Sequence, residues 1–344
     1  MRKGIELLFS VAIIMIIFVG CGQKAVVGGT SAAAEGAKSA VNMSKDANVA
    51  SNYKDTNTGG APVYMTTNIT PEGLQAVYDA LKWSPTGKLA IKVSTGERGS
   101  NYLRQDLIGK FVRGLQGTYV ECNTAYGGPR GSAAEHYELA KEHGFTPIDI
   151  MDESGSMELP VSNGNVLKGT NYVGTHFANY DSMIVLSHFK GHAMAGFGGA
   201  IKNISIGIGS SKGKSLIHSG GQYTSGYRTD SVDNFQMAMA EAGLSVSDAF
   251  DHGKKIIYIN VMNRLSIDCD CSGSPAEPEI HRIGILASTD PVALDKACLD
   301  LIWKAEGNKS FINRVENRHG IVSLEYGEKI GLGKRAYTLV QIDN

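Results

Sequence analysis

Short apolar runs alternate with stretches of helical periodicity from about residue 61 to the end of the chain, and this alternation limits the fold most strongly. Strands are expected at 62–67, 89–93, 118–122, 146–151, 182–187, 256–261, 283–287 and 336–342, and helices at 71–81, 103–115, 133–143, 230–250 and 290–305. Strands and helices that alternate in this way predict an α/β fold with a layered, largely parallel or mixed sheet and helices on both faces.

Two of the expected helices have clear start signals. Thr70 and Asp290 are residues that cap helices well, and each is followed by a proline, which suits the first helical position. The pattern between residues 152 and 180 is too irregular to assign elements.

The first 20 residues have the features of a bacterial signal peptide. Arg2 and Lys3 precede an apolar run of 13 residues from Leu7 to Val19, which is short for a helix that spans a bilayer. The following residues, Phe18-Val19-Gly20-Cys21, resemble the lipobox of bacterial lipoproteins, with Phe where that family prefers Leu. The resemblance implies cleavage before Cys21, lipidation of its sulfur and an anchor on the extracytoplasmic side of the bacterial cell membrane. An uncleaved anchor is the alternative interpretation.

Residues 21–60 would then form a lipidated N-terminus and a flexible tether, because they contain almost no large apolar side chains that could form a core. The folded domain is expected at 61–344. The chain has 33 basic and 34 acidic residues and a formal net charge of -1. This balance excludes the basic surface of a nucleic-acid-binding protein. Membrane contact is expected through the lipid anchor alone.

The passage after the strand at 182–187 is rich in chemically active side chains. It contains His188, Lys190, His192 and Lys202 among several glycines. Ligands of open α/β sheets bind beyond the carboxyl ends of strands, which is where this passage begins. The two histidines are candidates for metal ligands or for hydrogen-bonding loop residues. Lys202 lies in a short apolar, glycine-rich stretch, where an unpaired charge would be costly, so Lys190 and Lys202 are candidates for holding an anionic substrate.

A second glycine-rich stretch follows at 209–215. Its spacing is one residue short of a phosphate-binding Walker loop, because Ile208 stands where the first glycine would be needed. Nucleotide binding is therefore not expected. The turn and either Lys212 or Lys214 remain candidates for binding another anion.

Five cysteines are present, and four of them follow Cys21: Cys122, Cys269, Cys271 and Cys298. Cys269 and Cys271 flank Asp270 in a loop, where they could chelate a metal, act in catalysis or form a disulfide. Cys298 shares a helix face with apolar residues and is expected to be buried and inert. The sequence does not decide the pairing of these cysteines.

Three ordered motifs resemble the family known as domain of unknown function 362 (DUF362). They are residues 187–218 with Gly-His-x-x-x-Gly-Phe-Gly-Gly-Ala-x-Lys-Asn, residues 269–295 with Cys-Asp-Cys and Ser-Thr-Asp-Pro-Val-Ala-Leu-Asp, and residues 123–136 with Tyr126, Gly128 and Arg130. The resemblance covers roughly residues 61–330. Many members carry a ferredoxin-like cysteine-rich insert after the position of His218, but residues 219–227 contain no cysteine, so an iron–sulfur cluster is not expected.

The resulting hypothesis is a lipid-anchored extracytoplasmic metalloprotein or enzyme that acts on a small anionic molecule. Lys190, Lys202 and His192 are the candidate catalytic residues. The candidate ligands of a divalent metal are His188, His192, His218, Cys269 and Cys271, and the candidate substrate-binding residues are Gly198, Gly199, Asn203, Lys212 and Arg130. For an enzyme, we expect the histidines and the cysteine pair to converge within about 5 Å, with Asp270 behind them.

Two other interpretations remain open. A lipoprotein that binds a solute without catalysis would have two lobes with a closable cleft and would hold its anion through the backbone amides of the glycine-rich loop. A surface interaction module would have no deep pocket and a broad exposed apolar patch.

Overall fold

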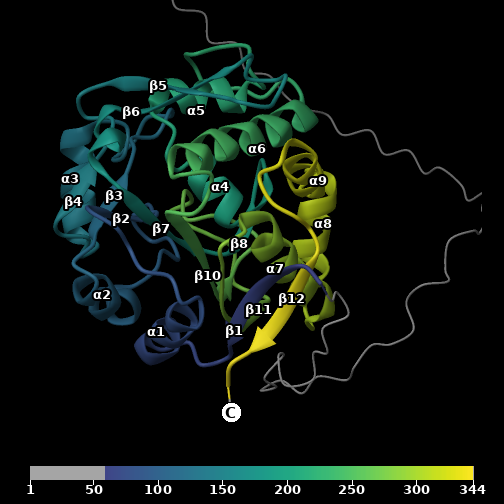
Figure 1. Ribbon diagram of the computed structural model, residues 1–344. Coiled ribbons are helices and arrows are strands. Elements are labelled where there is room, and N and C mark those ends of the chain that lie inside the picture. Colours follow the sequence, from purple (N-terminus) through teal and green to yellow (C-terminus); the bar gives the residue numbers. More distant parts are fainter. Residues whose placement is uncertain (1–58, 344) are drawn as a thin grey trace, which may run out of the picture. The chain divides into compact units, whose positions relative to one another are not determined.

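An eight-stranded mixed sheet crosses the computed structural model, which describes residues 59–343 (Figure 1). Seven strands point in one direction, because only β11 is antiparallel to its neighbours. The strand order is β12 (Tyr337–Gln341), β1 (Ala61–Thr66), β11 (Ile280–Ser288), β10 (Ile256–Leu265), β7 (Ser182–His188), β2 (Leu89–Lys92), β3 (Thr118–Glu121) and β4 (Ile148–Ile150). This arrangement confirms the predicted α/β class.

Strand β7 lies in the middle of the sheet and is buried along its whole length. Its alternate residues belong to different cores: Met183 and Val185 pack into one hydrophobic cluster, whereas Ile184 and Leu186 pack into another. A strand covered on both faces in this way has a nearly continuous apolar sequence, as predicted.

Helices supply the other half of each core. Apolar residues of α1 (Pro71–Ala80), α2 (Gln105–Gly114) and α3 (Ala133–Glu142) join the cluster that contains Ile184. The opposite cluster contains residues of α4 (Ala200–Ser205), α6 (Val232–Ala249), α7 (Pro291–Lys304), α8 (Lys309–Asn317) and α9 (Ile321–Ile330). Helices therefore cover both faces of the sheet, as Figure 1 shows.

The two predicted helix starts have the expected capping geometry. The Thr70 hydroxyl accepts a hydrogen bond from the amide of Gly73 at 3.2 Å. A carboxylate oxygen of Asp290 accepts from the amides of Val292 and Ala293, each at 2.9 Å. A cap of this kind stabilises a helix by about 1 kcal/mol.

Several elements were not predicted. The irregular region contains a separate antiparallel pair, β5 (Ser156–Pro160) and β6 (Thr170–Gly174), followed by the 3-10 helix η2 (Thr175–Asn179). The glycine-rich passage after β7 forms a small hairpin, β8 (Lys190–His192) and β9 (Gly196–Gly198), and then the short helix α4. The stretch that resembled a Walker loop is helix α5 (Ser211–His218), which Ser210 caps. It therefore has the geometry of an ordinary capped helix.

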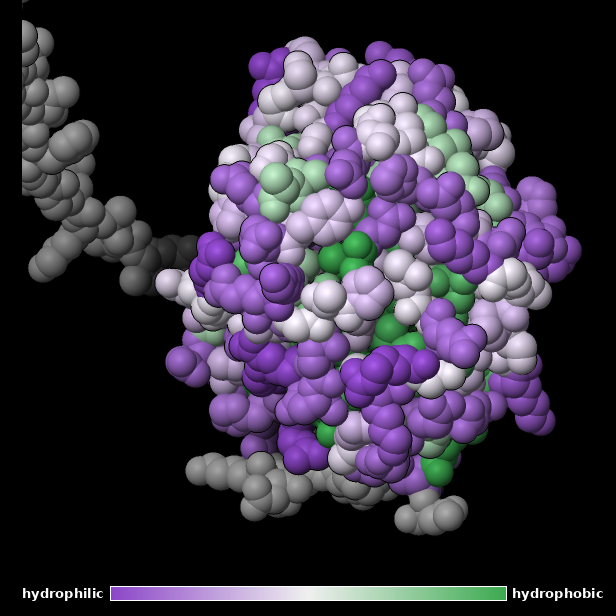
Figure 2. All heavy atoms as spheres, turned by 90° about the vertical axis from the view of Figure 1, so that its left-hand side faces the viewer, coloured by the Kyte–Doolittle hydropathy of each residue, from purple (hydrophilic) through white to green (hydrophobic). Residues whose placement is uncertain are grey.

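The surface shown in Figure 2 is mostly hydrophilic, with hydrophobic residues visible only between polar ones. Within residues 59–343, the large hydrophobic side chains that are exposed are Tyr223, Tyr227 and Trp303. None of the described helices is both long enough and apolar enough to cross a bilayer. The predicted signal peptide, the lipidation site Cys21 and the tether lie outside the described residues.

Candidate functional site

A cavity of about 100 Å³ lies at the carboxyl ends of β7, β2 and β3, which are neighbours in the sheet. Lys92 ends β2, Glu121 ends β3, and Ser187 and His188 end β7, and all four residues line the cavity. Open α/β sheets bind ligands at this position. The volume accommodates several water molecules or one small molecule.

Most of the predicted site residues also line this cavity. They are Arg130, His188, Lys190, His192, Gly198, Gly199, Lys202, Asn203, His218, Cys269 and Cys271. The hairpin β8–β9 carries Lys190 and His192 to the cavity, α4 carries Lys202 and Asn203, and the loop after β10 carries the two cysteines.

Lys212 is the exception among the predicted substrate-binding residues that are described. Its Nζ lies 3.5 Å from the centre of the Tyr172 ring, and it is not among the residues that line the cavity. Lys214, two residues later in α5, lines the cavity instead, and its Nζ donates to the carbonyl of Gly209 at 2.6 Å. Of the two lysines that the sequence offered in this stretch, the structure therefore places Lys214, and not Lys212, at the cavity.

Lys190 and Lys202 flank Gly198. A Cβ at this glycine would lie 3.4 Å from Cδ of Lys202 and 3.6 Å from Cε of Lys190. Lys190 forms an ion pair with Asp270 at 2.9 Å. Among the described residues, the ammonium group of Lys202 has no hydrogen-bond or ion-pair partner. The cavity therefore contains one fixed ammonium group and one unpaired ammonium group next to it.

The lining is strongly cationic. Five basic side chains, Lys92, Arg130, Lys190, Lys202 and Lys214, face two carboxylates, Glu121 and Asp270. Burial is the main cause that lowers the pKa of Lys202, and the charges of Lys190, Arg130, Lys214 and Lys92 add to it. Together they bring this pKa to about 7. Burial likewise lowers the pKa of Lys92 to about 8, although Glu121 opposes this effect.

Arg130 is positioned by protein groups. Its Nε donates to Glu97 at 2.9 Å, and its guanidinium also contacts Glu121 at 3.4 Å and the Tyr126 hydroxyl at 2.8 Å. Burial would raise the pKa of Glu121, but Lys92, a hydrogen bond with His136 and Arg130 together hold it well below its usual value. Arg130 thus contributes positive charge to the cavity while its donors bind protein acceptors.

Asn203 connects the short helix α4 to the ends of two strands. Its Oδ1 accepts from Lys92 Nζ at 2.9 Å, and its Nδ2 donates to the Ser187 hydroxyl at 3.0 Å. These contacts fix α4, and with it Lys202, relative to β2 and β7. Asn203 therefore has a positioning role in this structure.

Gly198 and Gly199 precede α4, and the amides that follow them are already bonded. Asp295 accepts hydrogen bonds from the amides of Ala200 and Ile201 at 2.8 and 2.9 Å. A Cβ at Gly199 would lie 2.2 Å from an oxygen of Asp295, so this close approach requires glycine. The start of α4 therefore binds an internal carboxylate. This contact argues against an anion held by these backbone amides.

His188 faces Asp270 and a backbone carbonyl. Its Nδ1 lies 3.0 Å from Asp270, and its Nε2 lies 2.7 Å from the carbonyl oxygen of Asn263. Both ring nitrogens are thus engaged, so His188 in this position offers no free nitrogen to a metal. The prediction of His188 as a ligand overlooked this role as a support for Asp270.

His218 and His192 differ in the nitrogen that they present. His218 Nδ1 donates to the carbonyl of Lys214 at 2.7 Å, and burial lowers its pKa to about 3. His192 Nδ1 instead accepts from the amides of Met194 and Ala195 at 3.1 and 2.9 Å. Burial, together with Lys202 and other nearby cations, holds the pKa of His192 well below its usual value, so the ring is neutral and carries its proton on Nε2.

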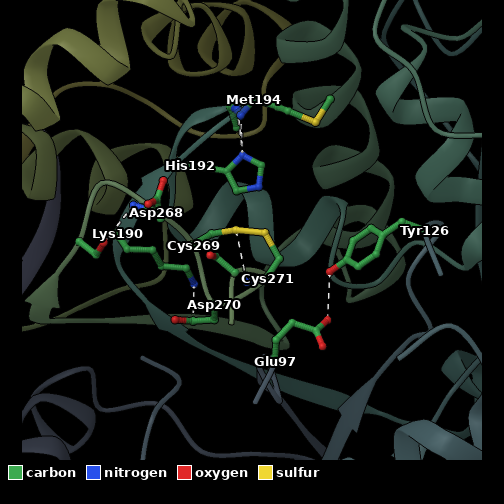
Figure 3. Close-up of a disulfide and its surroundings, with 12 residues drawn as sticks. Glu97, Tyr126, Lys190, His192, Met194, Asp268, Cys269, Asp270 and Cys271 are labelled. Carbon is green, nitrogen blue, oxygen red and sulfur yellow. Dashed lines mark hydrogen bonds and ion pairs between the residues drawn. A yellow bond between two sulfur atoms is a disulfide. The ribbon is translucent and has the colours of Figure 1, made fainter. Parts of the chain in front are cut away.

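Cys269 and Cys271 form a disulfide beside His192 (Figure 3). One potential ligand atom of each of these three residues lies within 4.8 Å of the others, which is close enough to share a metal ion. The disulfide occupies both sulfurs, and the tautomer of His192 puts a proton on the nitrogen that would bind. The donor set therefore fits a metal only after reduction of the disulfide and transfer of the His192 proton from Nε2 to Nδ1, which would remove the two amide hydrogen bonds of Nδ1.

The remaining two cysteines in residues 59–343 are free and buried. Burial raises the pKa of Cys122 to about 12 and raises that of Cys298 well above its usual value. Both thiols are therefore inert, as predicted for Cys298.

Sequence reasoning missed Lys92 and Glu121 as lining residues. A signal existed for both, because each is a charged residue that ends a strand directly after apolar residues. The hydrogen-bond partners of these two charged residues come from distant segments: His136 contacts Glu121, and Asn203 contacts Lys92. The sequence alone could not identify these pairs.

Comparison with known protein families matches residues 89–300, more than half of the chain, to "Domain of unknown function (DUF362)". No curated protein matches this chain. Among solved structures, similarity is found to the lactate racemase apoprotein of Thermoanaerobacterium thermosaccharolyticum, with 15% identity, a TM-score of 0.41, and coverage of 71% of this chain and 57% of that chain. A Thermotoga maritima protein has 11% identity and a TM-score of 0.36, with coverage of 76% and 58%. This chain thus spans less than two thirds of either protein.

Proposed function

We propose, starting from the fact that this chain belongs to the DUF362 family, that it is an enzyme that binds a small anionic molecule beside Lys202. The cavity at the carboxyl ends of β7, β2 and β3 would be its active site. The bound anion would lie among Lys190, Lys202 and Lys92, with His192 on the side of the disulfide.

The observation that carries this proposal is the unpaired state of Lys202. Lys202 is half-buried at the cavity wall, and an ammonium group held there without a partner is costly. Neighbouring Lys190, Arg130, Lys214 and Lys92 increase this cost, because they repel the charge of Lys202. An anion in the cavity would supply the missing partner, so the lining is complementary to a ligand of negative charge.

The same residues are suited to proton transfer. A lysine with a pKa of about 7 exists in both protonation states near neutral pH, so its Nζ is able to accept or release a proton. Lys190, which Asp270 fixes, would hold the negative charge of the substrate. His192 would donate a hydrogen bond from Nε2.

Metal binding belongs to the reduced form of the protein in this proposal. His192, Cys269 and Cys271 are the residues that would hold the ion, and a divalent metal there would act as a Lewis acid. His188 and His218 are left out of this ligand set, because His188 has both nitrogens engaged and His218 is not part of the three-residue cluster.

The two alternative interpretations have less support. A solute-binding protein is expected to have two lobes, whereas residues 59–343 are built around one central sheet with a small cavity at its edge. An interaction module is expected to have a broad apolar patch, whereas the large exposed hydrophobic residues within this part of the chain are few.

Anchoring at the membrane is the second part of the proposal. It depends on the lipobox-like residues before Cys21. Metabolic labelling with a fatty-acid analogue in a bacterial host is expected to label the wild-type chain and not the Cys21→Ser variant. Equal labelling of both chains would contradict lipidation at this sulfur.

The binding site is tested by calorimetry with acetate, phosphate and short organic acids on the full chain, with Lys202→Met and Lys212→Met compared. Loss of a charge-assisted hydrogen bond predicts affinity about 10- to 100-fold weaker for Lys202→Met. Lys212→Met is the matched control and should retain wild-type affinity. Equal weakening in both variants, or binding of neutral analogues alone, would refute the site. NMR of each bound ligand over time then separates an enzyme, which changes its ligand, from a binding protein.

A further inference from the structure

The Cys269–Cys271 disulfide borders the cavity, and its two residues differ in their access to solvent. Cys269 is buried, with 6% of its surface exposed, whereas Cys271 is exposed to solvent. A small molecule that enters the cavity from solvent therefore meets Cys271 first, and Cys269 forms the protected side of the bond.

The sulfur of Cys269 accepts one hydrogen bond from the backbone. The amide of Cys271 donates to Cys269 Sγ at 3.3 Å. His192 is fixed by the amides of Met194 and Ala195 on its Nδ1, and its other nitrogen faces the disulfide in Figure 3. Because the neutral ring carries its proton on that nitrogen, His192 presents a second N–H group to the sulfurs.

Cations line the cavity that this bond borders, while Asp270 between the two cysteines pairs with Lys190. Lys190 and Lys202 line the cavity with the two cysteines. Cationic surroundings and N–H donors favour a thiolate over a thiol, and a better-stabilised thiolate leaves a disulfide faster. The sulfur with the amide donor is Cys269, so the geometry favours Cys269 as the leaving group and Cys271 as the sulfur that is attacked.

We infer that Cys269–Cys271 is a reactive disulfide that exchanges with a small thiol carrying a negative charge. The choice of an anionic thiol rests on the proposed function of the cavity, whereas the reactivity of the disulfide rests on the exposure of Cys271 and on the hydrogen bond to the sulfur of Cys269.

The exchange has two steps. The thiolate of the first small thiol attacks Cys271 Sγ, a new S–S bond forms between them, the Cys269–Cys271 bond breaks, and its electron pair stays on Cys269 Sγ. A second small thiolate then attacks the sulfur of the bound small thiol, which releases a small-molecule disulfide and leaves Cys271 as a thiolate. Two small thiols are oxidised, the protein disulfide is reduced, and the two protons pass to the protein thiols.

The test uses the full chain, purified in air, with three thiols of different charge: mercaptoacetate, 2-mercaptoethanol and 2-aminoethanethiol. Samples are alkylated at intervals, and mass spectrometry measures the modification of each cysteine. After correction for the thiolate fraction of each reagent, reduction should be on the order of tenfold faster with mercaptoacetate than with 2-aminoethanethiol. Lys202→Met should reduce this preference, and Lys212→Met should preserve it. Cys122 and Cys298 are buried internal controls and should stay unmodified.

Two single-cysteine variants test the order of attack. With the symmetrical disulfide of mercaptoacetate, Cys269→Ser retains the exposed Cys271 and should form a mixed disulfide roughly tenfold or more faster than Cys271→Ser, which retains the buried Cys269. Equal rates in these variants, or free Cys269 and Cys271 thiols in protein purified in air, would overturn the inference.

Failure of the inference and failure of the proposed function give different results. Anion binding in calorimetry with a disulfide that resists excess thiol would overturn the exchange and leave the anion site intact. Exchange at equal corrected rates with all three thiols would support the reactive disulfide and contradict selection of an anionic ligand.

Discussion

Replacing Lys202 by Met should stabilise the protein, because the native ammonium group is half-buried at the cavity wall and has no partner among the described residues. Met has a similar length and no charge, so it fills the same space without the desolvation cost. A stabilising substitution in a cavity is expected where function, rather than stability, maintains the native residue.

The size of the effect follows from the pKa. Desolvation, followed by the neighbouring cations, lowers the pKa of Lys202 from 10.5 to about 7, which sets a ceiling of about 5 kcal/mol on the cost of the charged side chain. Water at the cavity mouth and relaxation of the neighbouring lysines reduce this value, so we expect a gain of about 1–3 kcal/mol at pH 6.

The sign of the pH dependence is fixed by the direction of the shift. The folded state holds the Lys202 proton less tightly than the unfolded state, so this lysine destabilises the fold fully below pH 7 and progressively less as the pH rises towards 10.5. The stability gained by Lys202→Met should therefore shrink between pH 6 and pH 9.5.

Urea unfolding of wild type, Lys202→Met and Lys212→Met at these two pH values measures the effect. Lys212, which lies over Tyr172 outside the cavity, is the control, and its replacement should give no stabilisation. A Lys202→Met variant that is less stable than wild type at pH 6, or whose gain is the same at both pH values, would refute the view that Lys202 is an unpaired, half-buried charge.

Three further predictions concern the same site. Binding of a small anion should weaken as the pH rises above about 7, because burial and the neighbouring cations lower the pKa of Lys202 to about that value. Calorimetry at pH 6 and 8.5 measures the affinity, and tighter binding at pH 8.5 would contradict the prediction. Asp295→Ala should cost about 2–4 kcal/mol, because it leaves the amides of Ala200 and Ile201 without their acceptor; urea unfolding tests this, and a neutral result would show that α4 does not depend on this contact. The reduced protein should bind about one zinc ion per chain, and the oxidised protein none, because the two cysteines act as ligands only as thiolates. Competition with a coloured chelator measures zinc uptake, and uptake by the oxidised form would rule out the cysteines as ligands.

The layered fold was predictable because each strand and helix has its own periodicity. The buried run of β7 and the caps Thr70 and Asp290 act through neighbouring residues, so the sequence reveals them directly. The short hairpin β8–β9 was missed because three-residue strands with glycines leave no periodic pattern.

The site was predictable only in part. Lys190, His192, Lys202 and the cysteine pair could be proposed because they follow buried strands. The roles of His188 and Arg130 depend on partners that folding brings from far along the chain, such as Asp270 and Glu97. The spacing of residues along the chain contains no information about these pairs. It also could not show which ring nitrogen of His192 accepts a backbone hydrogen bond.

The most direct test of the anion site is anomalous diffraction from crystals of the protein that contain bromide. The structure predicts a bromide peak in the cavity within hydrogen-bonding distance of Lys202 Nζ, and no such peak in crystals of Lys202→Met. Bromide bound only at surface lysines, and absent from the cavity in crystals of both wild type and Lys202→Met, would contradict the proposal that Lys202 binds a negatively charged ligand.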